Sequence, residues 1–303
     1  MNFSNWMDLR IDYAFKLFFA ESGTNRLVSL LNAIFANKAI PRVITSLTIT
    51  NPSLNKRSQE DKLSILDIRA ALSDGSFALI EMHLYGLDEF KHKAVRNWAK
   101  VYGEHLEQGE DYTYQRPVIC ISFIDGSITD AHNIPIEKVH ALFQIQERDS
   151  HQILLKNMEL HFIDMHAFVQ QFQEAATKGT LGEDMFTNWL ALITHAKIRN
   201  KEALAHICYE VEEIKMAAEV LTRFSEETMR RLEYESRMED WQVYKNKIAA
   251  FNQEIADANC RAEESNRRAE ESDREAAELR KLIATMSQII QDNGIPLPQT
   301  DET

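Results

Sequence analysis

The chain has 303 residues, 44% hydrophobic and 27% charged, which is typical of a globular protein and excludes wholesale disorder. Its 9 glycines and 6 prolines are few for this length, which excludes an all-β protein with many tight turns and favours a helix-rich chain. The net charge of −13 at first counts against a nucleic-acid partner, but residues 1–130 are nearly balanced, with 14 Lys and Arg against 16 Asp and Glu.

Cysteine usage and hydropathy indicate the compartment. Cys120, Cys208 and Cys260 form no closely spaced pair, which fits a reducing compartment and gives no zinc signature. The N-terminal sequence lacks the basic and apolar regions of a secretory signal, and no stretch approaches the roughly 18 apolar residues of a membrane span. We therefore expect a cytoplasmic protein with no membrane contact.

Apolar side chains at helical spacing predict two helices near the N-terminus. The first covers residues 8–20, where Ile11, Phe15 and Phe18 share a face. The second covers residues 24–37 and has Thr24 as a candidate N-cap. Segments rich in Val, Ile, Leu, Thr and Phe then predict three strands, at 42–50, 62–72 and 76–85.

The remaining pattern predicts a sheet followed by helices. A helix is expected at about 88–108, and strands are expected at 116–125 and 157–165. This order predicts an α/β or α+β core with a mixed central sheet flanked by helices, and a helical region after residue 166. The expected domains are a core at 1–165, a helical domain at 166–240, a coiled coil at 241–292 and a tail at 293–303.

Residues 248–290 repeat apolar or small side chains at alternating steps of three and four, the heptad pattern of a coiled coil. Within this stretch, RAEESNR (261–267) and RAEESDR (268–274) are near-identical units. A solvated single helix held by Glu–Arg pairs is the alternative. We favour a coiled coil and a homo-oligomer, because bulky apolar residues return at both ends of the Ala- and Ser-rich centre.

The second and third predicted strands carry Asp67, Glu81 and His83 among apolar residues. A two-residue turn between these strands would place Asp67 opposite Met82, whereas a three-residue loop with Gly75 in the left-handed conformation would place it opposite Glu81. We favour the loop, because it puts the two carboxylates and the imidazole on one face of the sheet and apolar side chains on the other.

Two facing carboxylates repel each other unless something compensates for their charge, and a divalent cation is the usual compensation. Carboxylate oxygens suit Mg²⁺ or Mn²⁺, and His83 is placed on the same face to act on an attacking water. The pattern therefore indicates metal-assisted hydrolysis of a phosphodiester. A half-exposed sheet face with ordinary surface charges is the alternative.

Several segments in order carry a resemblance to a known family. They are DYAFKLFF (12–19), LLNAIF (30–35), LDIRAALSDGSFALIEMH (66–83), the helix with Trp98, Lys100 and Tyr102, and PVICISFID (117–125). Over roughly residues 8–235 the chain resembles the PD-(D/E)XK nuclease superfamily, in particular its recombination-promoting nuclease (Rpn) or putative transposase branch. The resemblance implies a restriction-endonuclease-like core and a metal-dependent DNA endonuclease linked to recombination or mobile DNA.

The resemblance also implies roles for individual residues. Asp67 and Glu81 correspond to the metal-binding acids, and Asp12 is a candidate additional ligand, although an exposed acid at a helix start is the alternative. His83 stands where the family usually has Gln or Lys. An imidazole can orient water or accept a proton, but it is not a permanent cation. Lys93 stands where this branch often has Arg. Lysine keeps the positive charge but lacks the planar guanidinium group that can bind two oxygens at once.

Lys93, Arg96 and Lys100 step by three and four along the predicted helix, so they share a face that could contact the DNA backbone. Ordinary solvent exposure is the alternative for these side chains. Because of the departure at His83, the alternative function is a catalytically degenerate nuclease fold that binds nucleic acid or a partner as an oligomer.

Overall fold

The computed structural model describes residues 3–21, 23–50, 68–83, 89–104, 109–130 and 134–292. The chain divides into two compact units, Met1–Met238 and Glu239–Thr303. The first unit contains the sheet and the helices that pack on it, and the second contains most of the last helix, α8 (Thr228–Asp292). The domain boundaries expected from the sequence stay a prediction.

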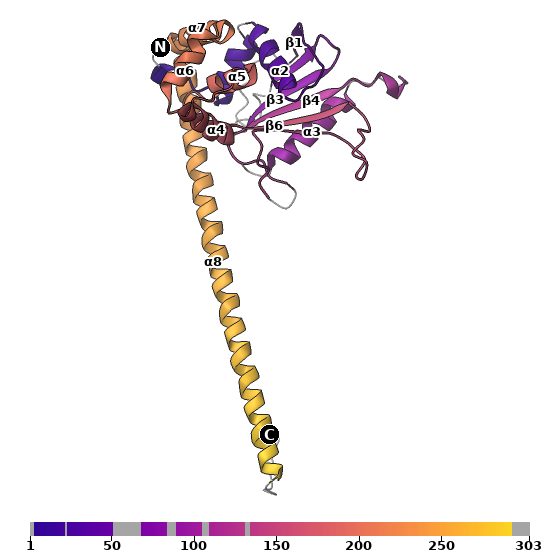
Figure 1. The fold of residues 1–303 in the computed structure, drawn as a ribbon, viewed down its shortest axis with the longest axis vertical. Coiled ribbons are helices and arrows are strands. Elements are labelled where there is room, and N and C mark those ends of the chain that lie inside the picture. The colour runs from indigo at the N-terminus through magenta and orange to yellow at the C-terminus, as the bar shows by residue number, and fades with distance from the viewer. Residues whose placement is uncertain are drawn as a thin grey trace. The chain divides into compact units, whose positions relative to one another are not determined.

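In the described part of the chain, a six-stranded mixed sheet forms the centre of the first unit (Figure 1). Its order is β1-β2-β3-β4-β6-β5, in which β3, β4 and β6 run parallel and the other neighbours are antiparallel. The strands are β1 (Leu47–Ile49), β2 (Ile68–Leu72), β3 (Phe77–His83), β4 (Val118–Ile124), β5 (His140–Phe143) and β6 (Met158–Asp164). The mixed sheet predicted from the sequence is confirmed.

Helices cover both faces of this sheet, and Figure 1 shows α2 and α3 on opposite sides of it. α3 (Glu89–Gly103) packs on one face. α1 (Asp12–Lys16) and α2 (Asn25–Asn37) pack on the other, where Phe15 lies against Phe123 of β4 and Phe35 against His161 of β6. The helices that follow the sheet are α4 (Met165–Lys178), α5 (Met185–Ile193), α6 (Lys201–Glu210) and α7 (Glu212–Glu226).

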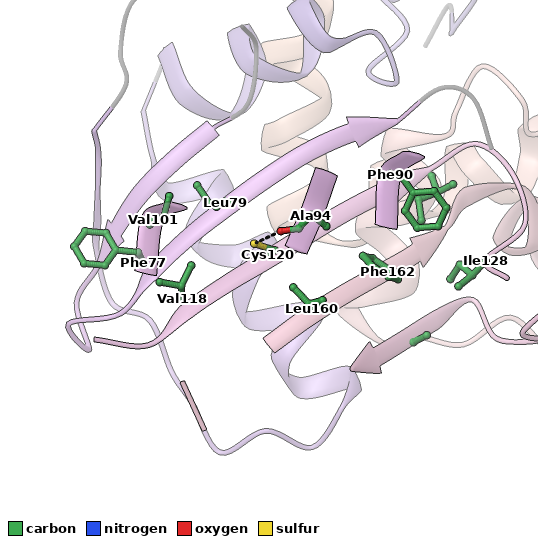
Figure 2. Close-up of a cluster of buried hydrophobic side chains, with 12 residues drawn as sticks. Phe77, Leu79, Phe90, Ala94, Val101, Val118, Cys120, Ile128, Leu160 and Phe162 are labelled. Atoms are coloured by element: carbon green, nitrogen blue, oxygen red, sulfur yellow. Dashed lines mark hydrogen bonds between the residues drawn. The ribbon is translucent and has the colours of Figure 1, made fainter. Parts of the chain in front are cut away.

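The core between α3 and the sheet is apolar. Its buried members include Phe77 and Leu79 of β3, Val118 and Cys120 of β4, Leu160 and Phe162 of β6, and Phe90, Ala94 and Val101 of α3 (Figure 2). Successive side chains on a strand point to opposite faces, so Glu81 and His83 lie on the same face of β3 as Phe77 and Leu79. The face that α3 covers is therefore apolar at one end of β3 and polar at the other.

The helices after residue 165 pack against the N-terminal helices. Trp189 of α5 is fully buried, and its indole Nε1 donates to Ser29 Oγ of α2 at 2.9 Å. The first turns of α8 reach the N-terminal segment, where Tyr234 Oη accepts a hydrogen bond from the backbone N–H of Asp8 at 2.9 Å. These contacts place the start of α8 close to the start of α1.

The loop between β2 and β3 sets the register of the two strands. Ile68 pairs with Ile80, and the backbone N–H of Leu72 donates to the carbonyl of Ser76 at 2.8 Å. Gly75 has φ of +85°, which a side chain would disfavour. The predicted three-residue loop with a left-handed glycine is confirmed. Asp67 lies outside the described residues, so its position opposite Glu81 stays a prediction.

Some local predictions differ from the structure. The helix predicted over 8–20 begins only at Asp12 and continues as a π-helical turn to Glu21. Thr24 occupies the N-cap position of α2, but its side chain makes no capping hydrogen bond because its backbone is already helical. The sequence does not predict β5. This strand has four residues, of which only His140 and Ala141 are buried, so its apolar and polar side chains do not alternate.

In the second unit, α8 is one continuous helix, as the heptad pattern predicts. Its apolar heptad side chains are exposed, for example Phe251 at 57%, Leu279 at 59% and Ile283 at 61%. None of the helices in the described ranges carries an apolar stretch long enough to cross a membrane.

Candidate active site

Glu81 lies near the carboxyl end of β3, on the face covered by α3, and only 4% of it is exposed. Lys93 and Asn97 are four residues apart on α3, so they project from the same side of that helix toward β3. Asn97 Nδ2 donates to Glu81 Oε1. Lys93 Nζ lies 3.2 Å from Glu81 Oε2, and His83 Nε2 lies 3.1 Å from the same oxygen.

These neighbours determine the protonation state of Glu81. Burial raises the pKa of its carboxyl group, but the His83 ring, the Lys93 charge and the Asn97 amide outweigh burial and lower the pKa to about 2. Glu81 is therefore a buried carboxylate that stays ionised at neutral pH. No hydrogen-bond donor is aligned with its Oε2 in the described residues, although two cationic or titratable groups stand beside that oxygen.

Asp12 is the first residue of α1, where its Oδ1 accepts a hydrogen bond from the next backbone N–H at 2.7 Å. Burial raises the pKa of this half-buried carboxyl group, and the positive charges of Arg237 and Lys93 act against that rise. Since Lys93 also contacts Glu81, the structure brings both carboxylates under the influence of one cation. Asp12 thus stands at a helix start, as its alternative interpretation expects, but it is half-buried rather than exposed, and its role as a metal ligand stays a prediction.

The three residues of α3 that were predicted to contact DNA differ in their surroundings. Lys93 is half-buried and paired with Glu81, whereas Arg96 and Lys100 are exposed. Lys93 therefore belongs to the site itself, and the other two form an exposed basic edge beside it.

Two site residues had no role assigned from the sequence. Asn97 carries no charge and no motif, and only its position four residues after Lys93 could have indicated it. Arg237 is distant from Asp12 in the chain and approaches it because the first turns of α8 pack on the N-terminal segment.

No group of three or more His, Cys, Asp or Glu side chains that could hold a metal ion occurs among the described residues. Of the predicted ligands, Glu81 and Asp12 are described and Asp67 is not. The donor chemistry nevertheless fits a hard divalent cation, because Glu81 offers a buried, ionised oxygen that lacks an aligned donor.

A second buried polar network lies on the opposite face of the sheet. Arg42 Nη1 donates to Glu159 Oε2 at 2.9 Å, and His161 Nε2 lies 3.3 Å from the same oxygen. His161 Nδ1 lies 3.0 Å from His140 Nε2, and His140 Nδ1 lies 2.8 Å from Asn37 Oδ1. Burial lowers the pKa of both histidines, that of His140 to about 2. Both imidazoles are therefore neutral.

A third network ties the N-terminal segment to the end of β4. Arg10 Nη1 donates to Asp125 Oδ2 at 2.8 Å, and Arg10 Nε donates to Asp8 Oδ1 at 3.0 Å. The backbone N–H of Asp125 donates to the carbonyl of His83 at 2.8 Å, so this network supports the end of β3. His195 lies nearby, and its burial lowers its pKa to about 4.

A family model described as PD-(D/E)XK nuclease family transposase matches residues 9–250, which include every described residue of the candidate site. The chain matches no curated protein and no solved structure.

Proposed function

Because the chain belongs to the PD-(D/E)XK nuclease family of transposases, we propose that it is a metal-dependent DNA endonuclease that acts in recombination or on mobile DNA. The observation that carries this proposal is Glu81, an ionised carboxylate held almost fully buried on the α3 face of β3. Burying a charged carboxylate is costly, and such a residue is retained more readily where its charge is used.

In this proposal, Glu81 and Asp67 hold Mg²⁺ or Mn²⁺, and Asp12 is an additional ligand. Asp67 precedes β2 by one residue, and one more step of the observed β2–β3 register would set it opposite Glu81. The bound cation would supply a Lewis acid for the scissile phosphate. His83, at 3.1 Å from Glu81 Oε2, orients the attacking water and accepts its proton.

Lys93 supplies the positive charge that His83 does not provide permanently. Family members usually carry Gln or Lys at the position of His83, whereas here the ammonium group reaches the same carboxylate from α3, at 3.2 Å. A fixed cation beside the reacting phosphate stabilises the negative charge that develops in the transition state. The exposed Arg96 and Lys100 extend this positive edge along α3 and contact the DNA backbone.

The substrate, the self-association and the compartment proposed for the chain follow from its family, its heptad segment and its cysteines. DNA is the proposed substrate, and a homo-oligomer forms through the heptad segment of α8, whose apolar side chains are exposed in the single chain. A cytoplasmic location agrees with the three cysteines, which form no disulfide in the described part of the chain.

Plasmid cleavage tests the proposal. The purified chain is incubated with supercoiled plasmid in Mg²⁺, in Mn²⁺ and in EDTA, together with the Asp67→Ala and Glu81→Gln variants. Cleavage should require the metal and disappear in both variants. Glu174→Gln, which changes an exposed carboxylate on α4, is the matched control and should cleave like the wild type.

Two other results of the plasmid assay would contradict parts of this proposal. Cleavage that persists in Glu81→Gln would remove this residue from the site. If folded wild-type protein binds DNA but does not cleave it in either metal, the chain is a degenerate nuclease fold that acts by binding, which is the alternative function.

A further inference from the structure

The second unit presents an apolar seam with no partner within the described chain. Side chains along α8 from Ile248 to Met286 recur in steps of three and four, and five of the bulky ones are more than two fifths exposed: Phe251, Ile255, Leu279, Ile283 and Met286. An exposed heptad seam on a helix of this length is typical of a coiled-coil strand before it meets its partner.

The heptad frame favours two strands. A step of three leads from each a position to the next d position. The a positions are therefore Ile248, Ile255, Ala262, Ala269, Ala276 and Ile283, and the d positions are Phe251, Ala258, Ser265, Ser272, Leu279 and Met286. The bulky a positions are all isoleucine, whereas Leu279 and Met286, which are not branched at Cβ, occupy d positions. β-Branched residues at a with leucine at d favour parallel two-stranded coiled coils.

The charges beside the seam favour the same arrangement. In a parallel, in-register pair, each g residue faces the e residue of the partner's next heptad. Arg268 then faces the partner's Asp273, and Glu275 faces the partner's Arg280, while no like charges meet at any other g–e pair. Arg268 also contacts Glu264 of its own helix, at 2.6 Å, but that pair is exposed and can rearrange.

The antiparallel arrangement is less favourable. The alignment that matches the bulky ends sets Ile248 opposite the partner's Met286 and brings Arg268 against the partner's Arg268 across the two-fold axis. Sliding one helix by a heptad removes this repulsion but sets Leu279 opposite the partner's Ala262, which leaves the bulky residues poorly matched.

We infer that two copies of the chain pair in parallel and in register along α8, from Ile248 to Met286. The inference rests on the proposed self-association of the chain and names its partner, stoichiometry and direction. Each first unit joins its α8 at the amino-terminal end of the seam, so a parallel pair tethers both first units at the same end of the coil. Two candidate sites thus become available to one DNA duplex.

Disulfide cross-linking of the full chain tests the direction. Cys260 is exposed and is replaced in a Cys260→Ser background, whereas Cys120 and Cys208 are buried. Ala276→Cys in this background should form a disulfide-linked dimer on mild oxidation, because position 276 faces its own copy in a parallel pair. In the antiparallel alignment it faces position 258, and the two copies of position 276 lie about 27 Å apart, far beyond the roughly 7 Å that a disulfide can span.

A mixture of the Ala276→Cys chain with a size-tagged Ala258→Cys chain tests for the antiparallel arrangement. A cross-link between the two different chains would form only in the antiparallel pair and would overturn the inference. A mass in solution other than that of a dimer, measured by light scattering, would overturn the stoichiometry. Plasmid cleavage by the same protein is measured separately, so a failure of this inference is distinguishable from a failure of the nuclease proposal.

A charge exchange tests the register. Arg268→Glu should weaken dimerisation by roughly 10-fold, because it sets two acids against each other on both sides of the seam. Adding Asp273→Arg should restore the wild-type dissociation constant. If the double variant dimerises as weakly as the single variant, these two residues do not face each other and the register is wrong.

Discussion

Acidification from pH 7.5 to 5.5 should destabilise the first unit strongly, because it contains three buried histidines. His140, His161 and His195 are at most 3% exposed, and burial lowers the pKa of each below the ordinary value of 6.5. In the unfolded chain these imidazoles take up protons as the pH falls through 6.5, whereas in the folded protein they stay neutral. The unfolded state therefore binds more protons, and folding stability falls with pH.

The magnitude follows from the proton linkage. Between pH 7.5 and 5.5, one histidine that titrates only in the unfolded state lowers the free energy of unfolding by about 1.4 kcal/mol. His140 and His195, whose pKa values in the folded protein of about 2 and about 4 lie below this range, together lower it by about 3 kcal/mol, a large share of the 5–15 kcal/mol that typically stabilises a domain, and His161 acts in the same direction. Asp12 and Asp164 act in the opposite direction, because burial raises the pKa of each carboxyl group. Glu81 has its pKa lowered to about 2 from 4.5, so its contribution is lost only at lower pH, between these two values.

Urea unfolding followed by far-ultraviolet circular dichroism at both pH values measures this loss. His140→Gln removes one titrating ring and should reduce the loss by about 1.4 kcal/mol, the contribution of one such histidine. A wild-type protein that is equally stable at both pH values would show that the buried histidines are protonated in the folded state. A variant that loses as much as the wild type would exclude His140 from the effect.

Four further substitutions, at Arg42, Arg69 and Lys93, have defined outcomes. Arg42→Met should lower the free energy of unfolding by about 3–5 kcal/mol, because it leaves Glu159 buried without its cation. Arg69→Met is the matched control in a more exposed ion pair and should cost no more than about 1 kcal/mol, as urea unfolding of both variants would show. Lys93→Gln should reduce the rate of plasmid cleavage by roughly 10²–10³-fold, and Lys93→Arg should retain most of the rate. If Lys93→Gln cleaves normally, the cation beside Glu81 does not stabilise the transition state.

Local patterns in the sequence predict most of the sheet and the long helix. The strands that contain Ile68, Ile80 and Ile121 are apolar enough to be recognised, and the glycine at position 75 predicts the loop that sets the register. The heptad steps of α8 are recognisable for the same reason, since each depends only on residues a few positions apart. Helix ends and the short strand at His140 are less predictable, because few residues decide them.

The residues of the candidate site divide in the same way. Glu81 and His83 follow from strand alternation and the family motif, and Asp12 follows from the motif alone. Their neighbours could not be predicted, because Asn97 and Arg237 reach the two carboxylates only after α3 and α8 have packed. The buried networks around Arg42 and Arg10 were missed for a similar reason.

The sequence by itself therefore determined the family, the order of the elements other than β5, the β2–β3 register and the side of β3 on which Glu81 lies. Only the tertiary structure decided which cation stands beside that carboxylate and which histidines are buried without charge. The physical reason is the separation along the chain of the residues that interact. Periodicity and turn chemistry act between neighbours in the chain, whereas ion pairing and the pKa of a buried group depend on which distant side chains packing brings within a few ångströms.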